Sequence, residues 1–104
     1  MHSDDFKLIT GSQLRAARAL LRWTQDDLAH SSQVAVAPIT EAEGDDGPIS
    51  VSAADARALR IALERAGIEF IDENGAGVGV RFAKRSGKPD EGLRPEQLTS
   101  ENVD

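Results

Sequence analysis

The chain has 104 residues, of which 39% are hydrophobic and 29% are charged, and its formal net charge at pH 7 is −6. This length fits one small domain, and the negative charge excludes a generally basic protein that coats nucleic acid. Because the chain has no cysteine, disulfide frameworks, thiolate zinc sites and cysteine nucleophiles are excluded as well. We find no signal peptide and no apolar run of membrane-spanning length, and we therefore expect a cytoplasmic protein without membrane association.

The first predicted helix covers residues 12–22. It follows a loose leader, residues 1–9, whose apolar Phe6, Leu8 and Ile9 can dock on the segment that follows. Thr10 and Gln13 have the spacing of a capping box, in which each side chain bonds the backbone N–H of the other residue. The apolar residues that follow recur at helical spacing and form one stripe: Leu14, Ala17, Leu20 and Leu21.

Two shorter helices are predicted next. Thr24 is a suitable N-cap for a helix that ends near residue 31, and acidic residues in its first turn suit the helix dipole. After a polar turn, a third helix is predicted over residues 37–43. It has Pro38 in its first turn, where proline is tolerated, and Gly44 stops it.

The fourth helix begins after a glycine-rich and acidic loop, with Ser52 and Asp55 at capping distance, and Gly67 is placed to end it. Two strand-like runs, residues 68–72 and 78–82, then flank an Asn74-Gly75 pair that is typical of a hairpin turn. The expected organisation is a helical domain over residues 10–67, a β-hairpin over 68–83 and a polar, flexible tail over 84–104.

Two short helices joined by a polar turn, with a longer helix on each side, are the arrangement of a helix-turn-helix domain. The stretch RAARALLRWTQDDLAHSSQVAVAPITEAEGDDGPIS resembles the XRE-type, Cro- and phage-repressor-like helix-turn-helix family. The resemblance is strongest with small bacterial members that end in a hairpin like GIEFIDENG. It implies a mainly α, lambda-repressor-like fold of four helices and a transcriptional regulator that binds double-stranded DNA.

The resemblance also implies roles for particular residues. Gln25 matches a glutamine whose amide commonly reaches a DNA phosphate. Glu43 matches an acidic residue that pairs with a basic residue on the first helix, which is Arg18 in this sequence. An acid at the end of a helix opposes the dipole, which is a separate reason to expect a cation beside it. The remaining candidate DNA contacts are Thr24, Val36, Ala37, Pro38, Thr40, Glu41, Arg15 and Arg22.

The hairpin is the candidate dimerisation element, either by pairing across two chains or by packing under the helices. Its apolar residues are Ile68, Phe70, Ile71, Val78, Val80 and Phe82. A homodimer would double a weak contact with DNA.

The third helix departs from the family because it lacks the donors that usually contact bases. Guanine is bound by Arg or Lys and adenine by Asn or Gln, whereas Glu41 can only accept a hydrogen bond from cytosine and Val36 or Ala37 can only touch a thymine methyl. Between Val34 and Asp46 the chain has four acidic residues and no basic residue. We therefore expect weak or indirect base readout. The alternative is a degenerate helix-turn-helix module that binds another regulator through its acidic third-helix surface.

Other chemistry has little support in the sequence. His2 and His30 are isolated, so neither a metal site nor a catalytic triad is indicated, and we expect no enzymatic activity and no cofactor. The glycines at 75–79 lack the βαβ unit of a dinucleotide site. Residues 81–88 include four basic residues. This composition fits either a flexible arm that contacts the phosphate backbone of DNA or a solvated tail.

Overall fold

The computed structural model describes residues 8–84, and their fold is mainly α: four helices followed by one two-stranded antiparallel hairpin. The helices are α1 (Gly11–Leu21), α2 (Gln25–Ser32), α3 (Val36–Glu43) and α4 (Ala53–Arg65), and the strands are β1 (Ile68–Ile71) and β2 (Gly79–Phe82). Each predicted helix is present, with its bounds shifted by one residue or so. The expected flexible tail lies outside the described residues apart from Lys84, as does the leader apart from its last two residues.

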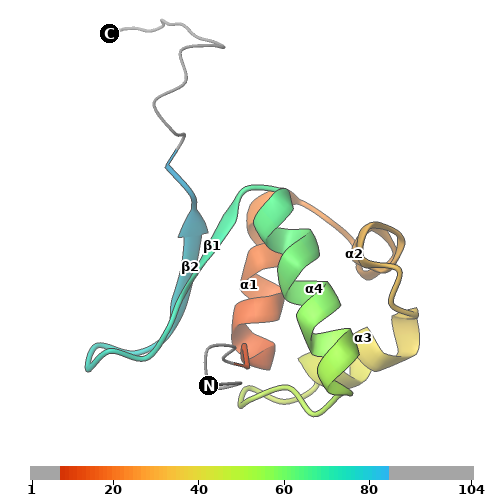
Figure 1. The fold of residues 1–104 in the computed structure, drawn as a ribbon, viewed down its shortest axis with the longest axis horizontal. Helices are drawn as coiled ribbons and strands as arrows, with labels where there is room; N and C mark the ends of the chain where they lie inside the picture. Colours follow the sequence, from red (N-terminus) through yellow and green to blue (C-terminus); the bar gives the residue numbers. More distant parts are fainter. Residues whose placement is uncertain (1–7, 85–104) are drawn as a thin grey trace, which may run out of the picture.

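The helices are arranged so that α1 and α4 separate the hairpin from α2 and α3. In Figure 1 the hairpin lies on one side of α1 and α4, and α2 and α3 lie on the other. The contacts agree, because β2 packs on α1 and β1 on α4, while α3 contacts α1 and α2. The hairpin therefore lies on the opposite side of the fold from α2 and α3.

The core is built from the apolar stripes of all four helices. Leu14, Leu28, Ile39, Leu59 and Leu63 have no exposed surface, and Trp23 packs against the core from a half-buried position. Leu20 is a correction: it was expected on the buried stripe of α1 but is 38% exposed. Leu20 lies two helical turns after Gln13, close to the end of α1 and beyond the part of the stripe that is packed.

The last residue of the expected leader, Ile9, also belongs to the core. Its side chain is 1% exposed, and its carbonyl accepts a hydrogen bond of 3.1 Å from the N–H of Ile49. The loop after α3 closes against the same place, since the N–H of Gly11 donates to the carbonyl of Gly47 over 2.9 Å. Within the expected leader, Ile9 therefore docks on the helical domain, through this backbone pairing and its buried side chain.

Gln13 joins the start of α1 to the hairpin. Its Oε1 accepts from the N–H of Thr10 at 2.9 Å and its N–H donates to Thr10 Oγ1 at 3.0 Å, which completes the predicted capping box. The Nε2 of the same side chain donates to the carbonyls of Ile71 and Gly79, at 3.2 and 2.9 Å. One buried glutamine thus caps a helix and fixes the hairpin on it.

The hairpin pairs Ile68 with Phe82, Glu69 with Arg81, Phe70 with Val80 and Ile71 with Gly79. Gly67, at the end of α4, has a φ of 108°, which lies in the left-handed region that glycine adopts without steric cost. The predicted turn from helix to strand therefore has its physical basis at this residue.

Candidate nucleic-acid interface

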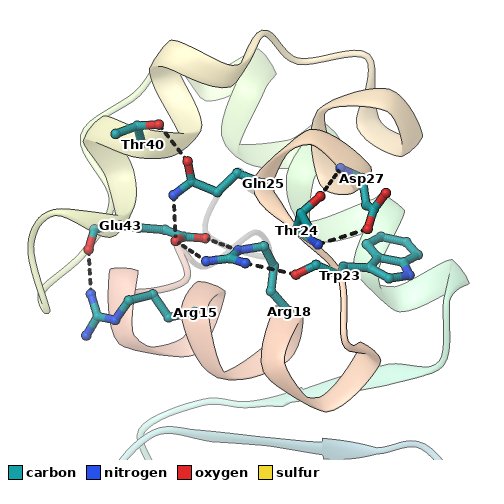
Figure 2. Close-up of polar contacts among 8 residues, drawn as sticks. All are labelled: Arg15, Arg18, Trp23, Thr24, Gln25, Asp27, Thr40 and Glu43. Carbon is teal, nitrogen blue, oxygen red and sulfur yellow. Dashed lines mark hydrogen bonds and ion pairs between the residues drawn. The ribbon is translucent and has the colours of Figure 1, made fainter.

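The candidate interface is formed by the start of α2 and the outer face of α3, and its geometry depends on one buried acid. The side chain of Glu43, the last residue of α3, is 5% exposed and forms an ion pair with Arg18 of α1. Arg18 donates from Nε and from NH2 to the two carboxylate oxygens, each over 2.7 Å. Its NH1 also donates to the carbonyl of Trp23 over 2.9 Å. The expected ion pair is present, and its two parallel bonds fix α3 on α1 (Figure 2).

Gln25 and Thr40 extend this network toward the surface. The Nε2 of Gln25 donates to Glu43 Oε1 over 3.0 Å, and its Oε1 accepts from the hydroxyl of Thr40 over 2.7 Å. Figure 2 shows this chain of contacts running from α3 through Gln25 to the carboxylate of Glu43 and on to Arg18. The amide that the resemblance assigns to a phosphate is thus engaged within the chain, and one N–H of its Nε2 remains for an outside partner.

Arg15, a candidate DNA contact, is used at the end of α3. Its NH1 donates to the carbonyl of Glu43, its NH2 bonds Ser12 Oγ, and it forms an ion pair with Asp46. Because α3 has no basic residue in its last turn, this guanidinium supplies the cation that favours the negative end of a helix dipole. Arg22, the other candidate cation, is exposed at the end of α1, and no described residue pairs with its guanidinium.

The environment of Glu43 keeps it ionised. Burial raises the pKa of its carboxyl, but the hydrogen bonds from Arg18 and Gln25 and the positive charges of Arg18 and Arg15 outweigh burial, so the pKa lies below its ordinary value. The hydrogen bond from Arg15 likewise lowers the pKa of Asp46. The network therefore depends on a carboxylate that is charged at neutral pH.

The start of α2 is capped by its own side chains. Thr24 Oγ1 accepts from the N–H of Asp27 over 3.0 Å, and Asp27 Oδ2 accepts from the N–H of Thr24 over 2.9 Å. Asp26 and Asp27 place two carboxylates in the first turn. They occupy the region where a helix N-terminus would otherwise attract a phosphate, so Thr24 offers a weaker phosphate site than its position alone suggests.

The outer face of α3 carries methyl groups and hydrogen-bond acceptors. Val36, Ala37, Thr40 and Glu41 are exposed and Pro38 is half-buried. The hydroxyl proton of Thr40 is already donated to Gln25, so its oxygen can serve an outside partner only as an acceptor, like the carboxylate of Glu41. The structure brings the candidate base contacts together on one surface, and this surface lacks side-chain donors.

Of the six hairpin residues expected to take part in dimerisation, two are buried, two are exposed, and Ile71 and Val80 are half-buried. Ile68 and Phe70 are 2% and 7% exposed in the chain's own core, so they are not available to a partner. Val78 and Phe82, in contrast, are 45% and 57% exposed. The sequence missed this division because both groups alternate with the same period.

Residues 8–84 show no cluster of three metal-ligating side chains and no helix with the length and apolar character to cross a bilayer. No protein-family model matches the chain, and no curated protein matches it significantly.

Proposed function

We propose that the chain is a DNA-binding transcriptional regulator of the XRE helix-turn-helix type, which acts as a dimer. The observation that supports this most is the way α3 is held. Ile39 and Ala42 are buried on its inner side, Glu43 is clamped by Arg18 and Gln25, and the opposite side stays exposed. A helix fixed on one side and uncovered on the other is what insertion into a major groove requires.

The chemistry of the exposed side defines the expected base preference. Val36 and Ala37 offer methyl contacts to thymine, and Glu41 and Thr40 offer acceptors to the amino groups of cytosine or adenine. Guanine presents two acceptors in the major groove and has no matching donor on α3. Base readout is therefore weak, and DNA shape contributes the rest of the specificity.

Binding should be measured by fluorescence anisotropy at low salt, with the region upstream of the chain's own coding sequence and a scrambled duplex of the same composition. We expect at least about tenfold tighter binding to the former, with a shallow salt dependence because few cations face the DNA. Equal binding to both duplexes, or none, contradicts the proposal.

Two substitutions of Glu41, with one control on α4, test whether α3 faces the DNA. Glu41→Gln removes an exposed acid from the interface and should tighten binding about threefold, since one repulsion with phosphate is lost. The control Glu64→Gln makes the same change of charge on α4 and should leave affinity unchanged. In selection from a random duplex pool, Glu41→Arg should shift one position of the motif toward guanine.

A second candidate function is binding of a basic protein partner through the same end of the fold. The observation that favours it is the acidity of this surface: Glu41 and Asp45 are exposed, and the side chain of Asp46 is 82% exposed although it pairs with Arg15. If a partner captured by the native chain is lost with Glu41→Lys while DNA affinity is unchanged, this function replaces the first. Sequence-specific DNA binding with no captured partner excludes it.

A further inference from the structure

We infer that the outer edge of β2 is a self-association surface, on which β2 of a second copy pairs antiparallel about a two-fold axis through Val80. This inference deepens the proposed function, because it names the surface and the register of the dimer. In this register Val78 lies opposite Phe82 of the second copy, and Gly79 lies opposite Arg81 of the second copy. The two hairpins would form one four-stranded sheet.

The first observation is the hydrogen-bonding pattern of the hairpin. The N–H of Ala83 donates to the carbonyl of Gly67 over 2.8 Å, and these residues are directly opposite one another in the register. Because bonded and non-bonded pairs alternate in an antiparallel ladder, Glu69 with Arg81 and Ile71 with Gly79 are the bonded pairs. The N–H and C=O groups of Val80 and Phe82 therefore point away from β1, and no other described segment bonds them.

The second observation is the difference between the two edges of this sheet. On β1 the outward-pointing groups belong to Ile68 and Phe70, which are buried. On β2 they belong to the half-buried Val80 and the exposed Phe82. Backbone groups at an open edge form a template for another strand. The β2 edge is thus the one that can accept a partner.

The third observation is that the edge matches itself in one register. With the axis through Val80, the exposed side chains of Val78 and Phe82 meet, and each Arg81 faces a glycine. An axis through Arg81 would place two guanidinium groups opposite each other, which is unfavourable. An axis through Phe82 would place Val80 opposite Lys84. Of these three registers, only the one through Val80 places both Val80 and Phe82 opposite apolar side chains and keeps the two Arg81 apart.

The neighbouring helix continues the apolar surface. Leu20 lies two helical turns after Gln13 on the same side of α1, and Gln13 is the residue that bonds the hairpin. Its 38% exposure adds an apolar side chain on the hairpin side of α1. The outer face of α3 lies on the other side of α1 and α4 (Figure 1), so this dimer leaves it uncovered.

The register can be tested by disulfide crosslinking, because the native chain contains no cysteine. Directly opposite residues of a bonded pair have Cα atoms about 5.5 Å apart, a separation that a disulfide can bridge. Oxidised Val80→Cys should therefore form a covalent dimer. Val78→Cys alone should not, since the two copies of residue 78 would be about 13 Å apart, whereas a mixture of Val78→Cys and Phe82→Cys should crosslink. A Val80→Cys chain that crosslinks no more than Val78→Cys overturns the inference.

A proline substitution tests the edge independently. Val80→Pro removes an N–H that points outward, so the chain's own ladder keeps its bonds. We expect sedimentation to show a monomer with unchanged circular dichroism, while the control Val80→Thr, which keeps the N–H, stays dimeric. A Val80→Pro chain as dimeric as the native one contradicts the inference.

The two proposals fail in different ways. A native chain that is monomeric but binds its duplex specifically rejects the dimer surface alone. A chain that crosslinks through Val80→Cys but binds no duplex specifically rejects the proposed function alone.

Discussion

The inner side of α3 is buried and hydrogen-bonded within the chain, whereas its outer side is exposed. On the inner side, Ile39 and Ala42 have almost no exposed surface and Glu43 has three donors around it. On the outer side, Val36, Ala37 and Glu41 are exposed. Glu43, which the family resemblance pairs with Arg18, lies on the inner side. The resemblance therefore says more about how α3 is held than about what α3 contacts.

Breaking the clamp on the inner side should have the largest effect. Arg18→Met leaves the buried carboxylate of Glu43 without its main partner, and we expect a loss of about 4 kcal/mol in the free energy of unfolding. The measurement is urea denaturation followed by circular dichroism. The control Arg81→Met breaks an exposed pair with Glu69 and should change little. Equal losses in the two variants would mean that burial of the pair is unimportant.

The apolar part of the inner side should be nearly as sensitive. Ile39→Ala removes a side chain that is 0% exposed and should lower the free energy of unfolding by about 3 kcal/mol, because a cavity remains in the core. Val36→Ala, one turn earlier on the outer side, should change it by less than about 0.5 kcal/mol. Thermal melts of both variants compare the two sides directly, and similar shifts would contradict the difference described above.

Lowering the pH should weaken the ion pair between Arg18 and Glu43. The folded pKa of Glu43 lies below its unfolded value, so its contribution to stability is present above the unfolded pKa, about 4.3, and is lost as pH falls through the folded pKa. Urea denaturation between neutral pH and about pH 3 measures this loss. Glu43→Gln should have a flatter pH dependence than the native chain. A variant with the native slope would assign the acid sensitivity to other carboxyl groups.

Removing the hydrogen bond between Thr40 and Gln25 should have the smallest effect. Thr40→Val removes the hydroxyl that donates to Gln25, and we expect a loss of about 1 kcal/mol because the site is exposed. Thr40→Ser keeps the donor and should retain native stability. If Thr40→Val keeps native stability in chemical denaturation while Thr40→Ser loses it, the methyl group and not the hydroxyl is what matters at this position.

Local patterns predicted the helices and the hairpin because their causes lie within a few residues. Thr10, Thr24 and Ser52 each accept a hydrogen bond from a backbone N–H three residues ahead. The left-handed Gly67 ends the fourth helix as expected. The pairing of Arg18 with Glu43 was also accessible, because the family resemblance and the helix dipole indicated the same contact.

Other contacts were out of reach because they join elements far apart in the chain. Gln13 was predicted as a capping residue, but its bonds to Ile71 and Gly79 span 58 and 66 residues. Arg15 was assigned to DNA, and the structure uses it at the end of α3. Equal periodicity likewise gave no means to separate the buried Ile68 from the exposed Phe82.

The sequence by itself determined where the helices begin and end to within about a residue, that each helix has an apolar face, and that α3 lacks donors, because these follow from backbone preferences and from side-chain chemistry. The tertiary structure decided which polar groups are already used and which remain exposed. That decision depends on how α1, α3 and the hairpin meet, and a hydrogen-bond donor such as the hydroxyl of Thr40 is available to a partner only if no neighbouring element has taken it.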